Sequence, residues 1–204
     1  MTRIIKIVDR VLHIYGRLDE IIARFRAATG MECPEGCSYC CRNWCVETTV
    51  LEVLPLGLEI YARHEEEAVL SSIADKEACG DSVCAVVLPN SSHGSQGSCG
   101  YYAWRPLVCR LFGYAVRRNK RMEAELCPCR IIRETEPSSV RRAEIAIREG
   151  LELPVYQEAF MHIASLDPAT GYRMLPVNRA IKEALEYLYW IRPRGKGWKK
   201  ASGY

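Results

Sequence analysis

Cysteine is the residue whose number and spacing stand out in this chain of 204 residues. Thiolates bind soft metals and carry out redox chemistry. The chain holds eleven cysteines, of which five fall within residues 33–45 and none lies after Cys129. The cysteine content, about 5%, is below the roughly 8–10% that is typical of small disulfide scaffolds. This distribution predicts that one part of the chain gathers sulfur atoms and that the rest does not.

The densest cluster is Cys33-x3-Cys37-x2-Cys40-Cys41. Its short spacings allow successive thiolates to converge on one centre after a tight turn. We expect the side chains of the consecutive residues Cys40 and Cys41 to leave the backbone in different directions. Both would then be hard to place in one tetrahedral zinc site with Cys37. Two centres, or a multi-iron cluster with wider ligand spacing, would accommodate them better.

A second group of cysteines follows further along the chain, in the stretch from Cys84 to Cys127, and it includes the run Arg105-Pro106-x2-Cys109-Arg110. Together the two groups give eight candidate metal ligands: Cys33, Cys37, Cys40, Cys41, Cys84, Cys99, Cys109 and Cys127. Eight equals two sets of four, and four is the usual number of ligands for a closed zinc site or an iron–sulfur cluster.

These motifs resemble the YkgJ-like cysteine-cluster family, a zinc- or iron-chelating CxxCxxCC domain. The family pattern continues with a cysteine before a short apolar stretch and then with C-x-I-Y-x-x-R-P-x-x-C-R-x-F. The residues in register with this last part are Cys99, Tyr102, Arg105, Pro106, Cys109, Arg110 and Phe112, and Cys84 fits the middle part. The resemblance covers roughly residues 33–128 and implies metal chelation by these cysteines.

The chain departs from the family pattern at several points. The first spacing is x3 rather than x2, and Tyr101 stands where the family has an aliphatic residue. Three cysteines lie outside the pattern, and no ligand role is assigned to them: Cys45, Cys79 and Cys129.

Two arginines, Arg105 and Arg110, flank Cys109. Four thiolates around Zn²⁺ carry a net charge of −2, so nearby guanidinium groups would neutralise the site and donate hydrogen bonds to sulfur. We interpret both arginines in this way. Binding of an anionic substrate and a surface salt bridge are the alternatives. Arg110→Ala is therefore expected to lower metal retention without abolishing folding.

The pattern of the whole chain predicts a single, mainly α domain with a small antiparallel β element, in which helices wrap an irregular cysteine-centred metal-binding core. Its predicted parts are an N-terminal helix over residues 1–30, the cysteine core over 31–129, C-terminal helices over 137–191 and a basic tail over 192–204.

Shorter elements are also predicted. Thr48 or Thr49 caps a helical region that Pro55 breaks early, and a further helix follows from Leu58 to Ala74. A strand at 83–88 precedes a Ser/Gly-rich loop. Residues 108–117 form a strand that pairs with 121–126 in a hairpin. Pro137, Pro154 and Pro176 each open a helix, because proline fits the first helical turn.

Composition limits where the protein acts and what it binds. The sequence has no unbroken apolar stretch of the kind found in signal peptides or membrane-spanning helices, which predicts a cytoplasmic protein with reduced thiols. The net charge is only +3, and no nucleic-acid-binding motif is present, so we expect no membrane partner and no nucleic-acid partner.

Three functions remain open at this stage. The first is a metal-binding protein that holds a [4Fe–4S] cluster or Zn²⁺, with a slight preference for the cluster, for metal handling, electron transfer or structure. The second is a methyltransferase-like modifying enzyme, since flagellin lysine methylases contain a similar cysteine cluster. The third is a zinc-stabilised interaction module that contacts a protein partner through its terminal helices.

Overall fold

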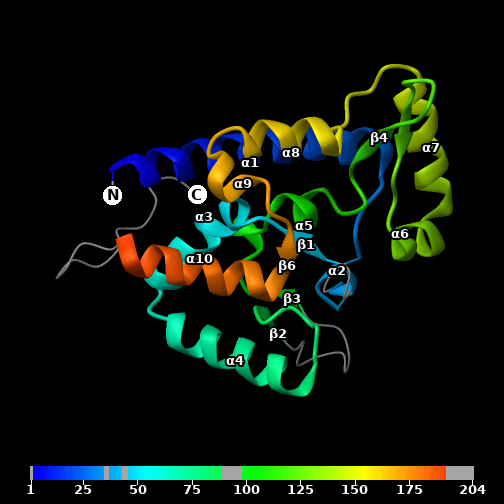
Figure 1. Cartoon of the computed structure of the whole chain (residues 1–204). Coiled ribbons are helices and arrows are strands. Elements are labelled where there is room, and N and C mark those ends of the chain that lie inside the picture. Colours follow the sequence, from blue (N-terminus) through cyan, green and yellow to red (C-terminus); the bar gives the residue numbers. More distant parts are fainter. Residues whose placement is uncertain (1, 35–36, 43–45, 89–97, 192–204) are drawn as a thin grey trace.

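The computed structural model describes residues 2–34, 37–42, 46–88 and 98–191 (Figure 1). The described residues contain ten α-helices: α1 (Thr2–Thr29), α2 (Tyr39–Arg42), α3 (Val50–Ala62), α4 (Glu66–Cys79), α5 (Leu107–Leu111), α6 (Arg130–Thr135), α7 (Pro137–Arg148), α8 (Tyr156–Ala164), α9 (Pro168–Gly171) and α10 (Val177–Ile191). A 3-10 helix, η1, spans Tyr102–Trp104. Residues 89–97 of the Ser/Gly loop predicted over 89–100, Cys45 and the basic tail lie outside the described residues, and Ser98 and Cys99 of that loop form a strand.

The strands are short and pair in three antiparallel two-stranded sheets. These pairs are β1 (Glu47–Thr48) with β6 (Leu175–Pro176), β2 (Val87–Leu88) with β3 (Ser98–Cys99), and β4 (Val116–Arg118) with β5 (Ala124–Leu126). The prediction of a mainly α fold with a small antiparallel β element is therefore confirmed.

Helix α3 lies at the centre of the fold, and every residue from Val50 to Tyr61 is buried. A helix that is buried on all sides needs apolar residues all round, which this segment supplies. On one side α3 packs closely against α10, since a Cβ at Gly57 would come within 2.8 Å of Leu188. The Tyr61 hydroxyl also donates to the carbonyl of Leu185 at 3.1 Å.

The prediction that Pro55 breaks this helix is wrong, because α3 continues through it to Ala62. Thr49 caps the helix, and its side chain and that of Glu52 satisfy each other's backbone N–H groups. The single helix predicted from Leu58 to Ala74 is also wrong. It is two helices, α3 and α4, separated by a turn in which His64 has a φ of 59°.

Helix α1 packs its apolar face into the core and ends before Gly30, whose φ of 66° suits a helix terminus. Figure 1 shows α1 and α8 along one side of the molecule, α10 and α4 along the other, and α3 between them. Helices α6 and α7 stand at one end beside the β4–β5 hairpin. Buried residues from α1, α3, α5, α7 and α10 belong to one hydrophobic cluster.

The predicted hairpin is present as β4 and β5, but its first strand is shorter than expected. Residues 107–111 form helix α5 rather than a strand, and Pro106 occupies its N-cap position. The strand predicted at 83–88 is confined to Val87 and Leu88. The three predicted helices are present as α7, α8 and α10. Pro137 lies in the first turn of α7 as expected, whereas Pro154 precedes the N-cap of α8 and Pro176 belongs to β6. Helices α6 and α9 have no counterpart in the predictions.

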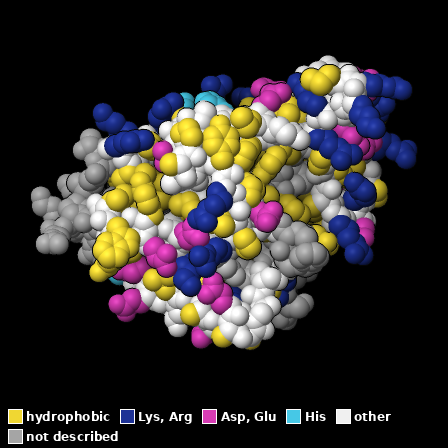
Figure 2. All heavy atoms as spheres, in the orientation of Figure 1, with side chains coloured by type: hydrophobic (Ala, Val, Ile, Leu, Met, Phe, Trp, Pro, Cys, Tyr) yellow, Lys and Arg dark blue, Asp and Glu magenta, His cyan; other side chains and the backbone are white. Residues whose placement is uncertain are grey.

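The surface carries scattered Lys and Arg side chains and patches of hydrophobic ones (Figure 2). Exposed hydrophobic residues include Met161, Tyr172, Tyr189 and Trp190, which come from α8, α10 and the end of α9. None of the helices in the described part of the chain combines the length and the apolar character that a bilayer span requires.

Candidate functional site

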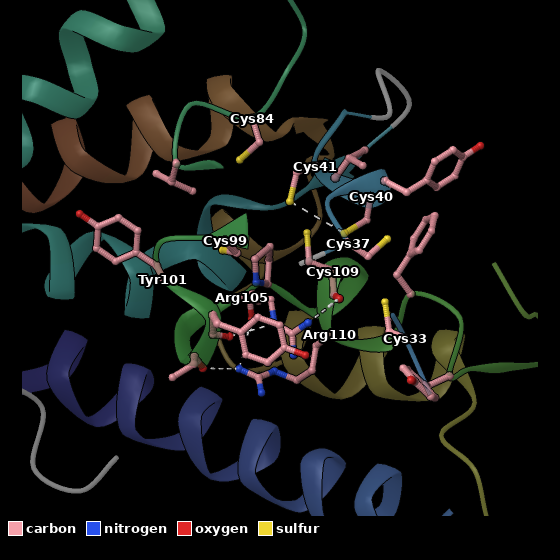
Figure 3. Close-up of a pocket in the computed structure, with 18 of the residues that line it drawn as sticks. Cys33, Cys37, Cys40, Cys41, Cys84, Cys99, Tyr101, Arg105, Cys109 and Arg110 are labelled. Atoms are coloured by element: carbon pink, nitrogen blue, oxygen red, sulfur yellow. Dashed lines mark hydrogen bonds between the residues drawn. The ribbon is translucent and has the colours of Figure 1, made fainter. Parts of the chain in front are cut away.

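The cysteines surround one cavity of about 590 Å³ between α1, α2, α5 and the β2–β3 hairpin (Figure 3). Eight thiols line it: Cys33, Cys37, Cys40, Cys41, Cys84, Cys99, Cys109 and Cys129. Seven of these are among the candidates predicted from the sequence. The structure therefore brings together residues that are nearly a hundred positions apart in the chain, and all of the described cysteines are free thiols.

Local structure explains how the first cysteines reach the cavity. The N–H of Cys37 donates to the carbonyl of Pro34 at 3.1 Å, and the thiols of Cys33 and Cys37 are in contact. Cys40 and Cys41 lie in the short helix α2. The carbonyl of Cys41 accepts from the N–H of Cys84 at 2.9 Å, which fixes α2 against the segment that leads into β2.

The remaining thiols come from a hairpin and two helix starts. Cys99 pairs with Val87 across β2 and β3, which brings it beside Cys84. Cys109 lies in α5, and the N–H of Leu107 in the first turn of that helix donates to the buried carboxylate of Glu52 at 3.1 Å. This bond links α5 to the central helix α3 and thereby positions Cys109.

Cys129 lines the cavity, whereas Cys127, which the sequence pattern includes among the candidate ligands, does not. Cys127 is exposed, does not line the cavity, and directs its Sγ to the carbonyl of Glu125 at 3.7 Å. Cys129 is buried at the N-cap of α6, where its Sγ accepts from the N–H of Ile132 at 3.4 Å. Cys129 is not part of the family pattern. A helix that begins at residue 130 is the signal that could have identified it.

The consecutive residues Cys40 and Cys41 do not direct their side chains apart as expected, because their Sγ atoms are 3.9 Å from each other. The hydrogen bond from Cys41, helped by the positive charge of Arg105, lowers the pKa of Cys40 to about 7 against the opposing effect of burial. The same contact and burial raise the pKa of Cys41. Cys40 therefore loses its proton more readily than an ordinary cysteine, and the thiolate is the form that binds metal.

Burial is the main cause of the raised pKa of five other cavity thiols, those of Cys33, Cys84, Cys99, Cys109 and Cys129. It raises the pKa of Cys33 and of Cys84 to about 12. Burial likewise raises the pKa of Cys99 and of Cys109, and in both cases Arg105 opposes it. A cation placed among these groups would stabilise their thiolates and reverse this trend.

Arg105 and Arg110 occupy different environments. The guanidinium of Arg105 stacks on the ring of Tyr102, 3.4 Å from its centroid, and Nη1 donates to the carbonyl of Cys109 at 3.4 Å. Its charge therefore acts directly on the thiols. Arg110 turns away from them: Nη1 pairs with Asp19 of α1, and Nη2 donates to the carbonyl of Ala103 at 2.6 Å. Arg110 holds α1, η1 and α5 together.

The pH dependence of alkylation provides a test of this electrostatic picture. In metal-free protein, Cys40 is expected to react with iodoacetamide at a half-maximal rate near pH 7, because its pKa is about 7. Cys41→Ala removes the hydrogen-bond donor and should move the profile to higher pH, whereas Cys79→Ser, at an exposed site, should not move it. Peptide mass spectrometry across a pH series measures both. A profile that is the same in Cys41→Ala as in the parent protein would rule out the proposed donor.

Within the described residues, no group of three or more Cys, His, Asp or Glu side chains has the arrangement of a metal-ion site. The cysteines instead share a cavity whose wall they line from several directions. Comparison with known proteins found no family model, no curated protein and no solved structure that matches the chain.

Proposed function

We propose that this protein binds an iron–sulfur cluster through the cysteines of the cavity. The observation that carries the proposal is the presence of eight thiols on the wall of one cavity of about 590 Å³. Cysteine thiolates are the standard ligands of [4Fe–4S] clusters. A single ion would draw its ligands to about 2.3 Å and leave little free volume, whereas a cluster of several atoms needs an enclosed space.

The donor chemistry of the cavity fits such a group. The thiols are soft ligands, and Arg105 supplies positive charge beside them. A bound cluster would supply one-electron redox chemistry or a structural cross-link. The chain's own residues would hold it through Cys109 on α5 and the cysteines of α2, and they would screen its negative charge through Arg105. The resemblance to the YkgJ-like family, carried by the residues from Cys99 to Phe112, supports the same proposal. A cytoplasmic location, in which thiols stay reduced, is part of the proposal.

Zinc is the second candidate, and one observation favours it. The 3.9 Å between the Sγ atoms of Cys40 and Cys41 is close to the roughly 3.8 Å that separates two thiolates on one tetrahedral zinc ion with bonds of about 2.3 Å. A zinc-bound form would serve structure or metal handling rather than electron transfer.

Purification without oxygen, followed by analysis of iron, acid-labile sulfide and zinc per chain, separates the two candidates. The cluster proposal expects a coloured protein with iron and sulfide in equal amounts. A colourless protein with zinc and no sulfide would replace the cluster by zinc. Protein that takes up neither metal after reconstitution would overturn the proposed function altogether.

Arg105→Gln should weaken metal retention by about 10- to 100-fold, because a positive charge beside the ligands is lost. Folding should be maintained, since the hydrogen bonds of Arg105 to other described residues go to the backbone carbonyls of Tyr102 and Cys109. Competition with a chelator measures retention. Arg63→Gln is the matched control, because Arg63 also stacks on aromatic rings, those of Tyr101 and Trp104. Equal retention in the two variants would show that Arg105 has no special role.

A further inference from the structure

We propose that Cys40 and Cys41 are an oxidative modification site, at which hydrogen peroxide or a similar two-electron oxidant joins the two neighbouring thiols in a reversible disulfide. The Sγ atoms of the two residues lie 3.9 Å apart, and Figure 3 marks this contact with a dashed line. The reaction takes place in the metal-free protein, so it does not depend on the proposed metal binding.

The surroundings of the pair leave both thiols open to a small oxidant. Cys40 and Cys41 lie in α2, a helix of four residues of which none is buried. Both side chains line the cavity and are partly exposed, whereas Cys84 and Cys129 on the same wall are buried. Contact between two sulfur atoms and access for the oxidant thus coincide at this pair.

Cys33 and Cys37 also have thiols in contact, and they are the competing pair. These two residues lie on irregular backbone, four positions apart. Helix α2 instead holds Cys40 and Cys41 on consecutive positions, and the N–H of Cys41 donates to the carbonyl of Ser38 at 2.9 Å. No intervening segment has to be ordered to bring these two sulfur atoms together, so we assign the disulfide to them.

The chemistry is a two-electron oxidation in two steps. One sulfur attacks an oxygen of hydrogen peroxide, the O–O bond breaks, and a sulfenic acid and one water molecule form. The second sulfur attacks the sulfenic acid, the S–S bond forms, and a second water molecule leaves. The protons of the two thiols end in the two water molecules. Two thiols and one peroxide therefore give one disulfide and two waters, with sulfur oxidised and peroxide reduced.

The structure also indicates why this disulfide is easily reversed. Consecutive side chains of a helix do not face each other, and a disulfide needs its two Cβ atoms within roughly 4.5 Å. The peptide unit between Cys40 and Cys41 must therefore leave its helical orientation, which breaks the bond from the N–H of Cys41 to the carbonyl of Ser38. A disulfide strained in this way is readily reduced, as regulatory disulfides are.

Peptide mapping of metal-free, full-length protein tests the assignment. The protein is treated with one equivalent of hydrogen peroxide, its remaining thiols are blocked with iodoacetamide, and it is digested with chymotrypsin and trypsin. Cleavage after Tyr39 and Arg42 separates the pair from Cys33 and Cys37. The expected product is the fragment Cys40-Cys41-Arg42 without alkylation and lighter by two hydrogen atoms, and reduced glutathione should restore its alkylation. A disulfide between the fragments of Cys33 and Cys37, or full alkylation of the pair after oxidation, would overturn the proposal.

Serine variants separate direct oxidation of the pair from exchange with other thiols. Cys41→Ser should abolish the disulfide, and the fold should be kept because no residue of α2 is buried. Cys79→Ser removes an exposed thiol that does not line the cavity and should keep the disulfide. Cys33→Ser should also keep it. Loss of the disulfide in Cys33→Ser would show that oxidation passes through the competing pair, which contradicts direct oxidation of Cys40 and Cys41.

Oxidation of the pair also has a consequence for metal uptake, and this consequence rests on the proposed function. It takes two thiolates from the cavity wall at once. Protein oxidised before reconstitution with iron and sulfide should therefore hold severalfold less metal than reduced protein. A disulfide that forms in a chain unable to bind metal would contradict the proposed function and leave the modification site in place. Normal metal binding in a chain that forms no such disulfide would do the reverse.

Discussion

Replacing Glu52 with alanine is expected to lower the free energy of unfolding by about 3 kcal/mol. The carboxylate is buried in α3 and accepts from the N–H of Thr49 at 3.2 Å, from the Thr49 hydroxyl at 3.1 Å and from the N–H of Leu107 at 3.1 Å. Each buried donor left without a partner costs about 1–3 kcal/mol, and release of the buried charge offsets part of the sum. Urea unfolding measures the loss.

Glu52→Gln is the matched control, because it keeps an accepting oxygen and removes the charge. Burial raises the pKa of Glu52 above its ordinary value of 4.5, although hydrogen bonds from Thr49 oppose the shift. The folded state therefore holds this proton more tightly than the unfolded state, and the associated stability is lost as pH rises above about 4.5. Relative to Glu52→Gln, the parent protein should lose stability with rising pH. If the free energies of unfolding of the parent protein and of Glu52→Gln changed in parallel from pH 4 to 8, the titration of a buried Glu52 carboxyl would be contradicted.

Arg110→Ala is expected to lower the free energy of unfolding by about 2–4 kcal/mol. Only 2% of its side chain is exposed, and the guanidinium lies 4.5 Å over the ring of Tyr15. The change removes the donor to the Ala103 carbonyl, leaves a cavity, and unpairs Asp19. Asp19 is 44% exposed and can be rehydrated, so its share of the loss is small.

Asp19→Asn removes the ion pair with Arg110 but keeps the Arg110 side chain. It should lower the free energy of unfolding by about 1 kcal/mol or less. Thermal or urea unfolding should show a much larger loss of stability for Arg110→Ala than for Asp19→Asn. This differs from the sequence-based expectation, in which Arg110 acts mainly on the metal. If Arg110→Ala reduced metal retention with no change in unfolding free energy, the structural assignment of Arg110 would be wrong.

The sequence predicts the long helices well because their apolar positions repeat at helical spacing. The residues of α1 and α10 are examples, and Gly30 ends α1 where expected. The sequence pattern predicts the short helices and strands poorly. Residues 107–111 have the apolar run of a strand, yet they fold as α5 because the Glu52 carboxylate, distant in sequence, accepts from the first turn of that helix. Pattern alone cannot reveal such a contact.

In the candidate site, too, the sequence predicts some features well and others poorly. Cysteine density and spacing predict which residues are candidates, and seven of the eight predicted thiols line the cavity. The choice between Cys127 and Cys129 depends on where β5 ends and α6 begins, and the separation of Cys40 and Cys41 depends on a four-residue helix. Boundaries of this kind are set by tertiary packing, so the sequence pattern leaves them undetermined.

X-ray absorption at the iron and zinc edges of oxygen-free protein tests most directly whether the cavity thiols bind metal. An iron–sulfur cluster in the cavity should give sulfur as the nearest neighbour of iron together with an iron–iron contribution. Zinc bound by the same thiols should have sulfur neighbours at about 2.3 Å. Metal surrounded by oxygen and nitrogen atoms, with no sulfur neighbours, would contradict metal binding by these thiols.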